Sequence, residues 1–199
     1  MSLLYNKGTT LDFNSFTKKY INDLHDLMKT INIDEFEKMK CHIKNQDNST
    51  SRIYIIGNGG SASTASHMAN DLGTGLKRRD ILSLDVLSLC DNTSISTALA
   101  NDIGYENIFY MQLKDILKPE DTIIAISCSG NSPNIIKAVE YAKEVGSTII
   151  SLTGFSGGKL KNDSDINIHF ETSSKDYGLV EDAHMIINHS LFSYFCKGI

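Results

Sequence analysis

Hydrophobic residues change their spacing near residue 50, and the change divides the chain into two parts. Before it, apolar side chains recur every three or four positions over 13–31 and again over 33–44, which predicts two amphipathic helices. A run of turn formers at 46–51 ends this helical preface. After it, short β-branched runs without polar alternation predict strands that are buried on both faces.

The second part alternates such strands with helices. Strands are expected at 52–56, 81–89, 122–126, 147–152 and 166–170. The clearest helix between them spans 132–145, where Ser132 is a predicted N-cap and Gly146 follows the last turn. A closing helix is expected over about 180–195. This alternation predicts an α/β fold with a five-stranded, doubly wound, mostly parallel sheet.

Length and composition favour one domain. The 199 residues are 41% hydrophobic, so we expect one domain with one core. Within it, 1–51 is expected to form N-terminal helices for oligomerisation, although the apolar stripe at 13–31 could serve either the sheet or a neighbouring subunit, and 52–199 is expected to form the sheet domain. No apolar run approaches the ~18–20 residues of a bilayer span, and residues 1–10 show no signal peptide. We therefore expect a cytoplasmic protein without a membrane partner. The four cysteines are far apart and are expected to be reduced thiols.

Charge argues against one class of partner. Acidic residues outnumber basic ones by 24 to 19, which gives a formal net charge of −5. A nucleic-acid binder usually presents a basic face instead. No nucleic-acid partner is therefore expected.

Two polar loops follow predicted strands and lead into helices. In a sheet of this kind, ligands bind beyond the carboxyl ends of the strands. Residues 57–61 (GNGGS) let backbone amides approach a ligand, and Ser61 is expected to cap the next helix. Residues 127–132 (SCSGNS) place three hydroxyls before a helix N-terminus, an arrangement that favours a phosphate monoester. Ordinary turns are the alternative. Neither loop carries the GxGxxG or lysine-containing phosphate motif, so no nucleotide cofactor is expected.

Two helices carry titratable residues at helical spacing. His67 and Asp71 are four apart and share a helix face, while Glu181 and His189 are eight apart and lie within roughly 80° of each other around the axis. Such pairs are often only helix-face hydrogen bonds or salt bridges. If the two helices face each other, two imidazoles and two carboxylates make an acceptable tetrahedral zinc set.

Five stretches resemble, in order, motifs of the sugar isomerase (SIS) domain family, and within it of the phosphoheptose isomerases. They are 57–61 with His67, 100–105 (ANDIGY), 127–132, 152–158 (LTGFSGG), and Glu181 with His189. The serine-rich loop is typical of the whole family, whereas His67 and His189 narrow the resemblance. It covers roughly residue 52 to the C-terminus, and a helical preface is also typical of the group.

The resemblance implies an assembly and a reaction. The expected architecture is a three-layer sandwich with a flavodoxin-like parallel sheet, in a homotetramer whose active sites lie at subunit interfaces. The expected reaction interconverts sedoheptulose 7-phosphate and D-glycero-D-manno-heptose 7-phosphate by proton transfer through an enediolate. Some phosphoheptose isomerases bind zinc at the positions that match His67, Asp71, Glu181 and His189.

The resemblance also implies residue roles. Phosphate-binding positions are matched by Ser127, Cys128, Ser129 and Ser132. Sugar-lining positions are matched by Asn58, Gly59, Gly60, Asn101 and Asp102, and we add Ser61 and Glu181 as substrate-binding residues. For the proton transfers we expect Asp71 or Glu181 as the base, His189 as the complementary acid or base, and His67 as an orienting or polarising group.

Two residues depart from the family pattern. Asp71 stands where phosphoheptose isomerases carry a glutamate, and Glu181 stands where they carry a glutamine. Shortening the acid by one methylene withdraws the carboxylate by roughly 1–1.5 Å, and a misplaced base can cost about a hundredfold in rate. Two alternatives therefore stay open: an isomerase of a different sugar phosphate, and a non-catalytic SIS module that senses a phosphosugar or binds a protein.

Overall fold

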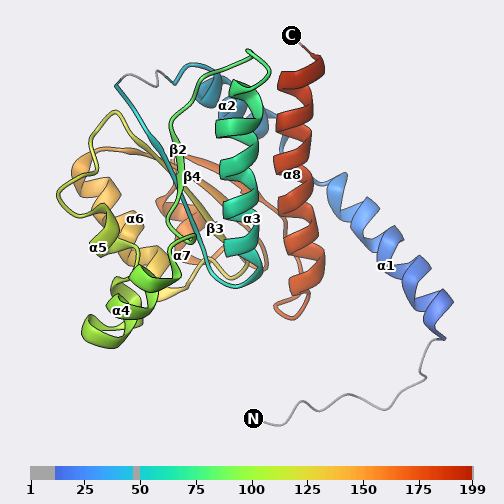
Figure 1. Cartoon of the computed structure of the whole chain (residues 1–199). Helices are drawn as coiled ribbons and strands as arrows, with labels where there is room; N and C mark the ends of the chain where they lie inside the picture. The colour runs from blue at the N-terminus through green and yellow to red at the C-terminus, as the bar shows by residue number, and fades with distance from the viewer. Residues whose placement is uncertain (1–11, 47–49, 199) are drawn as a thin grey trace.

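Five parallel strands form a single sheet at the centre of the computed structural model, which describes residues 12–46 and 50–198 (Figure 1). The strands lie in the order β2-β1-β3-β4-β5, the flavodoxin-like order that the sequence analysis expected. They are β1 (Ile53–Gly57), β2 (Val86–Ser88), β3 (Thr122–Ser127), β4 (Thr148–Thr153) and β5 (Ile166–His169). The signal-peptide assessment of 1–10 and the turn formers at 47–49 lie outside the described residues.

Burial explains why these segments are strands. Every residue of β1 and β3 is buried, as expected for apolar runs covered on both faces of a parallel sheet. The strand predicted at 81–89 is wrong in length, because only Val86–Ser88 pairs with β1. β2 has one neighbour only, so hydrogen bonding supports a shorter strand there.

Helices α2 (Ile33–Lys44), α3 (Gly60–Ala69) and α8 (Tyr177–Lys197) cover one face of the sheet (Figure 1). Their apolar side chains share a core with the strand residues that point to that face; α2 contributes the fully buried Met39 and Ile43. Residues 33–44 therefore belong to the same core as the sheet. The closing helix predicted at 180–195 is longer at both ends, since α8 begins at Tyr177 and ends at Lys197.

The opposite face is covered by α5 (Tyr110–Leu113), α6 (Pro133–Val145) and α7 (Gly158–Asp163). α4 (Thr93–Ile103) and the short 3-10 helix η2 (Tyr105–Asn107) lie at the carboxyl-end side of the sheet and contribute no fully buried residue. α6 begins after Ser132 and ends at Val145, and Gly146 follows its last turn as predicted. Gly146 adopts the left-handed conformation that is common after a helix. The three-layer sandwich is confirmed.

α1 (Phe13–Met28) projects away from the sheet (Figure 1). It ends three residues before the predicted boundary at Ile31, and none of its residues is buried. Its C-terminal half packs partly against the core, whereas Phe13, Phe16 and Ile21 are 83%, 54% and 60% exposed. The apolar stripe of the first helix is thus largely uncovered in a single chain.

Among the described residues, no helix is both long enough and apolar enough to cross a bilayer.

Candidate active site

A pocket opens where the strand order reverses, between the carboxyl ends of β1 and β3. The two strands pair in register from Ile53 opposite Thr122 to Gly57 opposite Ile126, so the loops that follow them emerge side by side. Such a switch point is where sheets of this type bind ligands. The cavity has a volume of about 130 Å³. It is lined by Asn58, Ser61, Ile126, Ser127, Cys128, Ser129, Ser132, Tyr177 and Glu181.

Glycines in the loop after β1 make room for backbone and for Glu181. A side chain at Gly57 would lie 2.5 Å from the Ser61 carbonyl oxygen, because the chain turns tightly into α3. A Cβ at Gly60 would lie 2.4 Å from the Glu181 carboxylate, which therefore rests directly over this glycine. α3 begins at Gly60, so Ser61 lies in its first turn and the predicted capping role of Ser61 is wrong. Ser61 lines the pocket instead.

The serine-rich loop is held by its own hydrogen bonds. The Gly130 amide donates to the Ser127 hydroxyl at 3.1 Å, and the Asn131 amide donates to the Ser129 hydroxyl at 3.3 Å. Ser132 occupies the N-cap position of α6, but its hydroxyl makes no hydrogen bond to that helix. This hydroxyl lines the pocket at a helix N-terminus, where an anion is favoured.

Asn58 ties the two loops together. Its side chain and that of Asn134 exchange two amide hydrogen bonds, at 2.9 Å and 2.8 Å. The Tyr105 hydroxyl donates a third, at 2.8 Å, to Asn58 Oδ1. These bonds fix the pocket wall, and they show that Asn58 is already engaged with protein groups.

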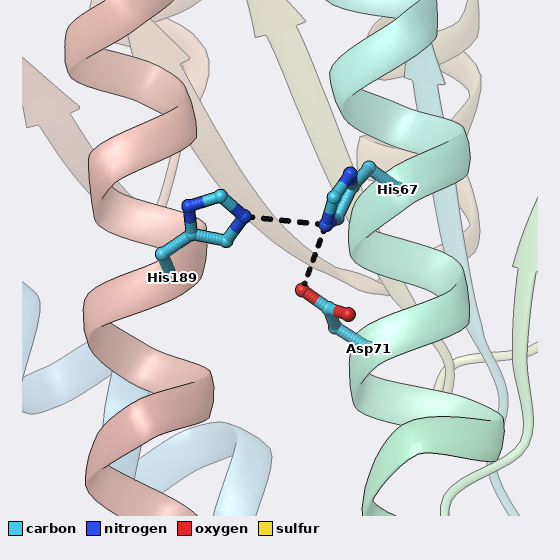
Figure 2. A group of neighbouring side chains, drawn as sticks. All are labelled: His67, Asp71 and His189. Carbon is cyan, nitrogen blue, oxygen red and sulfur yellow. Dashed lines mark hydrogen bonds and ion pairs between the residues drawn. The ribbon is translucent and has the colours of Figure 1, made fainter.

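A second cluster lies between α3 and α8, where His67, Asp71 and His189 point toward one another (Figure 2). The His67 Nε2 atom is 3.3 Å from Asp71 Oδ2 and 3.2 Å from His189 Nε2. Asp71 is 7% exposed. It lies in Asn70–Gly75, which continues α3 as a π-helix, a distortion frequent at functional sites. The predicted shared face of His67 and Asp71 is confirmed.

The donor set of this cluster fits a metal ion. The three ligand atoms lie within 4.8 Å of one another. The two separations that involve His67 Nε2, 3.2 Å and 3.3 Å, match the spacing of about 3.3 Å between ligands of a tetrahedral ion bound at roughly 2.0–2.1 Å. His67 Nε2 carries at most one proton, which cannot point at both Asp71 Oδ2 and His189 Nε2. One cation, in contrast, would be coordinated by all three atoms.

Three other predicted site residues lie apart from this cluster. Glu181 lines the pocket at the serine-rich loop and does not join His67, Asp71 and His189 in this chain. Asn101 and Asp102 lie at the end of α4, where they are exposed and hydrogen-bond to each other at 2.8 Å. The structure therefore brings together three of the four predicted metal ligands, and neither Asn101 nor Asp102 lines the pocket.

Cys128 lines the pocket together with Glu181. Burial and the negative charge of Glu181 raise the pKa of its thiol to about 11. A thiol with so high a pKa is protonated at neutral pH and is a poor nucleophile. We therefore do not expect Cys128 to act as a covalent nucleophile.

The sequence analysis missed several residues at the two sites. Tyr177 and Ile126 line the pocket, Asn134 anchors Asn58, and Asn188 contacts Asp71. Asn188 had a signal in the sequence, because it interrupts the apolar stripe of the last helix one position before His189. Tyr177 had none, since it precedes the predicted start of that helix.

Comparisons with known proteins agree on one family. A family model described as SIS domain matches residues 18–154. Phosphoheptose isomerase of Helicobacter pylori (strain P12) is 38% identical over 177 residues, 87% of this chain and 90% of that protein. Probable phosphoheptose isomerase of Thermoplasma volcanium is 34% identical over 174 residues, 87% of each chain. The structure of phosphoheptose isomerase from Neisseria gonorrhoeae matches with a TM-score of 0.79 and 26% identity, over 92% of this chain and 96% of that one.

Proposed function

This chain belongs to the SIS domain family and, within it, to the phosphoheptose isomerases, and from that premise we propose that it interconverts sedoheptulose 7-phosphate and D-glycero-D-manno-heptose 7-phosphate. The observation that carries the proposal is a pairing of two sites on the same two helices. The pocket, with its serine hydroxyls at a helix N-terminus, lies near the start of α3 and α8. His67, Asp71 and His189 lie further along the same two helices.

The pocket suits the phosphate end of the substrate. Ser127, Ser129 and Ser132 line it, and no lysine or arginine of the described chain does. Hydroxyls and the dipole of α6 would hold one phosphate group without a counter-ion. Glu181 and His189 are eight residues apart on α8, a rise of about 12 Å. A substrate that reaches from the pocket to the histidines therefore needs an extended carbon chain, as a heptose phosphate has.

The cluster suits the proton transfers at the other end. Aldose–ketose isomerisation requires a base for the proton next to the carbonyl and a group that moves protons between the two oxygens. Without a bound metal, Asp71, or Glu181 at the pocket, is the base in this proposal, and His189 is the complementary acid or base. With a metal on His67, Asp71 and His189, Glu181 is the carboxylate that remains free to act as the base. His67 contacts both Asp71 and His189, so it orients them.

Zinc is the metal that we propose for His67, Asp71 and His189, because two imidazoles and a carboxylate are a common zinc donor set. Bound there, it would polarise the sugar carbonyl and stabilise the enediolate as a Lewis acid. Three protein ligands leave a coordination position open for substrate.

The proposal includes a homotetramer with active sites at subunit interfaces. The cavity within one chain, about 130 Å³, is smaller than the ~300–1,000 Å³ of ordinary small-molecule sites. The uncovered apolar residues of α1 offer a surface on which another chain can pack. A cytoplasmic location, in keeping with four free cysteines, is also part of the proposal.

A substrate assay tests the reaction. We expect the purified protein to convert sedoheptulose 7-phosphate to an aldose phosphate, with deuterium from D₂O entering at C2, as NMR would detect. We expect His189→Ala to lower kcat by about 10²–10⁴-fold, because a general acid or base contributes about that much. The matched control is His25→Ala, since His25 is exposed on α1 away from both sites.

Three outcomes of that assay would contradict the proposal. Turnover of another sugar phosphate only would indicate a different isomerase. Tight binding without turnover would indicate a sensing or protein-binding module. Unchanged turnover in His189→Ala would show that His189 is not the acid or base of the reaction.

Metal analysis tests the zinc site. We expect about one zinc per chain in protein purified without chelator or nickel resin, and loss of the zinc in His67→Ala. Elemental analysis by mass spectrometry measures both. Active protein that holds no stoichiometric metal would exclude the zinc site.

A further inference from the structure

A buried asparagine contacts the Asp71 carboxylate from α8. Asn188 is fully buried, and its Nδ2 donates a hydrogen bond to Asp71 Oδ2 at 2.8 Å. Oδ2 is also the oxygen that faces His67 Nε2 at 3.3 Å. The other oxygen, Oδ1, receives from the described residues one long contact, of 3.4 Å, from Asn70 Nδ2. Among the described residues, Asn188 therefore supplies the short, buried hydrogen bond to the Asp71 carboxylate.

Burying Asn188 at this position of α8 destabilises the fold unless its amide group makes a hydrogen bond there. Most of its neighbours on the inward stripe of α8 are apolar and buried, among them Ile187 and Leu191, although the buried imidazole of His184 lies one turn before it. Its own Oδ1 has no hydrogen-bond partner among the described residues, and an unpaired buried polar atom is destabilising. Leucine or isoleucine would fill this place without that penalty. We therefore attribute the presence of an asparagine at this position to its hydrogen bond with Asp71.

The chemistry of the amide also sets its orientation. An ionised carboxylate only accepts hydrogen bonds, so the NH₂ group of Asn188 must face Asp71 and the carbonyl oxygen must face away. The aspartate side chain is short, and its carboxylate turns easily about χ2. A donor that holds Oδ2 from the α8 side limits that rotation and keeps the oxygen toward His67.

We propose that Asn188 is a positioning residue that holds the short Asp71 carboxylate in register with His67 and His189. Its role rests on the proposed function for its effect on turnover, but the geometric claim stands on the hydrogen bond and the burial alone. Replacing a group that hydrogen-bonds to a metal ligand and orients it typically lowers metal affinity or activity by about 10–100-fold.

Asn188→Leu tests the proposal, because it removes the donor and keeps a side chain of similar size. We expect kcat for sedoheptulose 7-phosphate to fall by about 10–100-fold with little change in KM, and zinc affinity, measured by competition with a chelating indicator, to fall by a similar factor. Ile187→Val is the matched control. It alters the same buried stripe without touching Asp71, and it should leave kcat and zinc affinity unchanged.

A second pair of variants separates positioning from folding. In an Asp71→Glu background the longer carboxylate no longer depends on the same bond, so adding Asn188→Leu should cost less than about threefold in kcat or zinc affinity. Residues that act through one contact are non-additive in this way. Equal losses from Asn188→Leu with and without Asp71→Glu would overturn the proposal, because a general packing defect would produce them.

Crystal structures decide the geometric claim even if the protein proves inactive toward sedoheptulose 7-phosphate. In Asn188→Leu, Asp71 Oδ2 should move away from His67 Nε2 by on the order of 1 Å, a displacement large enough to disturb catalysis. An unmoved carboxylate together with unchanged zinc affinity would refute the inference about Asn188. Failure of the wild-type protein to turn over any heptose phosphate would refute the proposed function instead.

Discussion

At the scale of the residue, buried polar side chains on α8 show how the core accommodates the site. The His184 imidazole is fully buried near Phe170, at a ring-centroid distance of 6.3 Å. Burial lowers its pKa to about 4; the nearby Thr153 backbone opposes this shift, and the charge of His169 adds to it. His184 is therefore neutral in the folded protein at physiological pH.

The pKa of His184 predicts an acid-sensitive fold. Between pH 6.5 and about 4, an unfolded chain binds a proton at this histidine and the folded chain does not. Stability is therefore lost as the pH falls through that window, by up to about 3 kcal/mol from this residue. We expect the difference in free energy of unfolding between wild type and His184→Leu to shift in favour of the variant at about pH 5 relative to about pH 7.5. Urea unfolding measures it.

His25→Leu, at an exposed position on α1, is the matched control for the exchange of an imidazole for a leucine. A pH-independent difference between wild type and His184→Leu would mean that burial does not lower the pKa of His184.

At the scale of the element, the pocket depends on the contact between two loops. Gly130, in the serine-rich loop, has φ +63°, and a Cβ there would lie 1.9 Å from the Gly157 carbonyl oxygen. The loops are also joined by backbone hydrogen bonds, including Leu160 amide to Gly130 carbonyl at 3.0 Å. The loop before α7 thus supports the loop that lines the pocket.

Gly130→Ala should damage both stability and binding. Overlap with backbone leaves no flexible side chain to yield, so we expect a loss of at least about 3 kcal/mol in unfolding free energy and a raised KM. Gly146→Ala is the matched control. Gly146 also has positive φ, +88°, but no described atom lies within 4 Å of its Cβ position, so only the left-handed strain of about 1–2 kcal/mol applies. Equal losses would contradict the loop contact.

At the scale of the whole molecule, α1 is a helix that one chain leaves largely uncovered. Its link to the body includes a 2.6 Å hydrogen bond from the Tyr20 hydroxyl to Asp182 on α8. Burial and the neighbouring carboxylate raise the pKa of Tyr20 to about 12, so the hydroxyl remains a donor at neutral pH. Phe13, Phe16 and Ile21 stay exposed beside this attachment.

The proposed homotetramer predicts a tetramer in solution, with the exposed face of α1 in an interface. Light scattering should give four times the chain mass of 22.0 kDa, and Phe13→Ser combined with Phe16→Ser should yield smaller species with lower kcat. Ile116→Ser, at an exposed apolar position on another surface, should leave the mass unchanged. A stable wild-type monomer with full activity would exclude an active site shared between subunits.

Sequence reasoning succeeded where the information is local. The apolar runs predicted β1 and β3, because burial on both faces requires such runs, and they also marked the edge strands β2 and β5, which are only partly buried. The spacing of His67 and Asp71 predicted their contact, because one helical turn joins them. Prediction from the sequence failed at the ends of strands and at a helix cap. The 81–89 strand is shorter, since pairing sets its length, and Ser61 does not cap α3, since the helix begins one residue earlier.

The sequence by itself determined the alternation of strands and helices, the two polar loops and the helix faces that carry the histidines, all of which depend on neighbours a few positions apart. Only the tertiary structure decided which distant groups meet. His67 and His189 are 122 positions apart, and Asp71 and Asn188 are 117 apart; they touch because α3 and α8 pack side by side on one face of the sheet. The same packing leaves Glu181 at the pocket, because the rise of α8 separates it from His189 by about two turns.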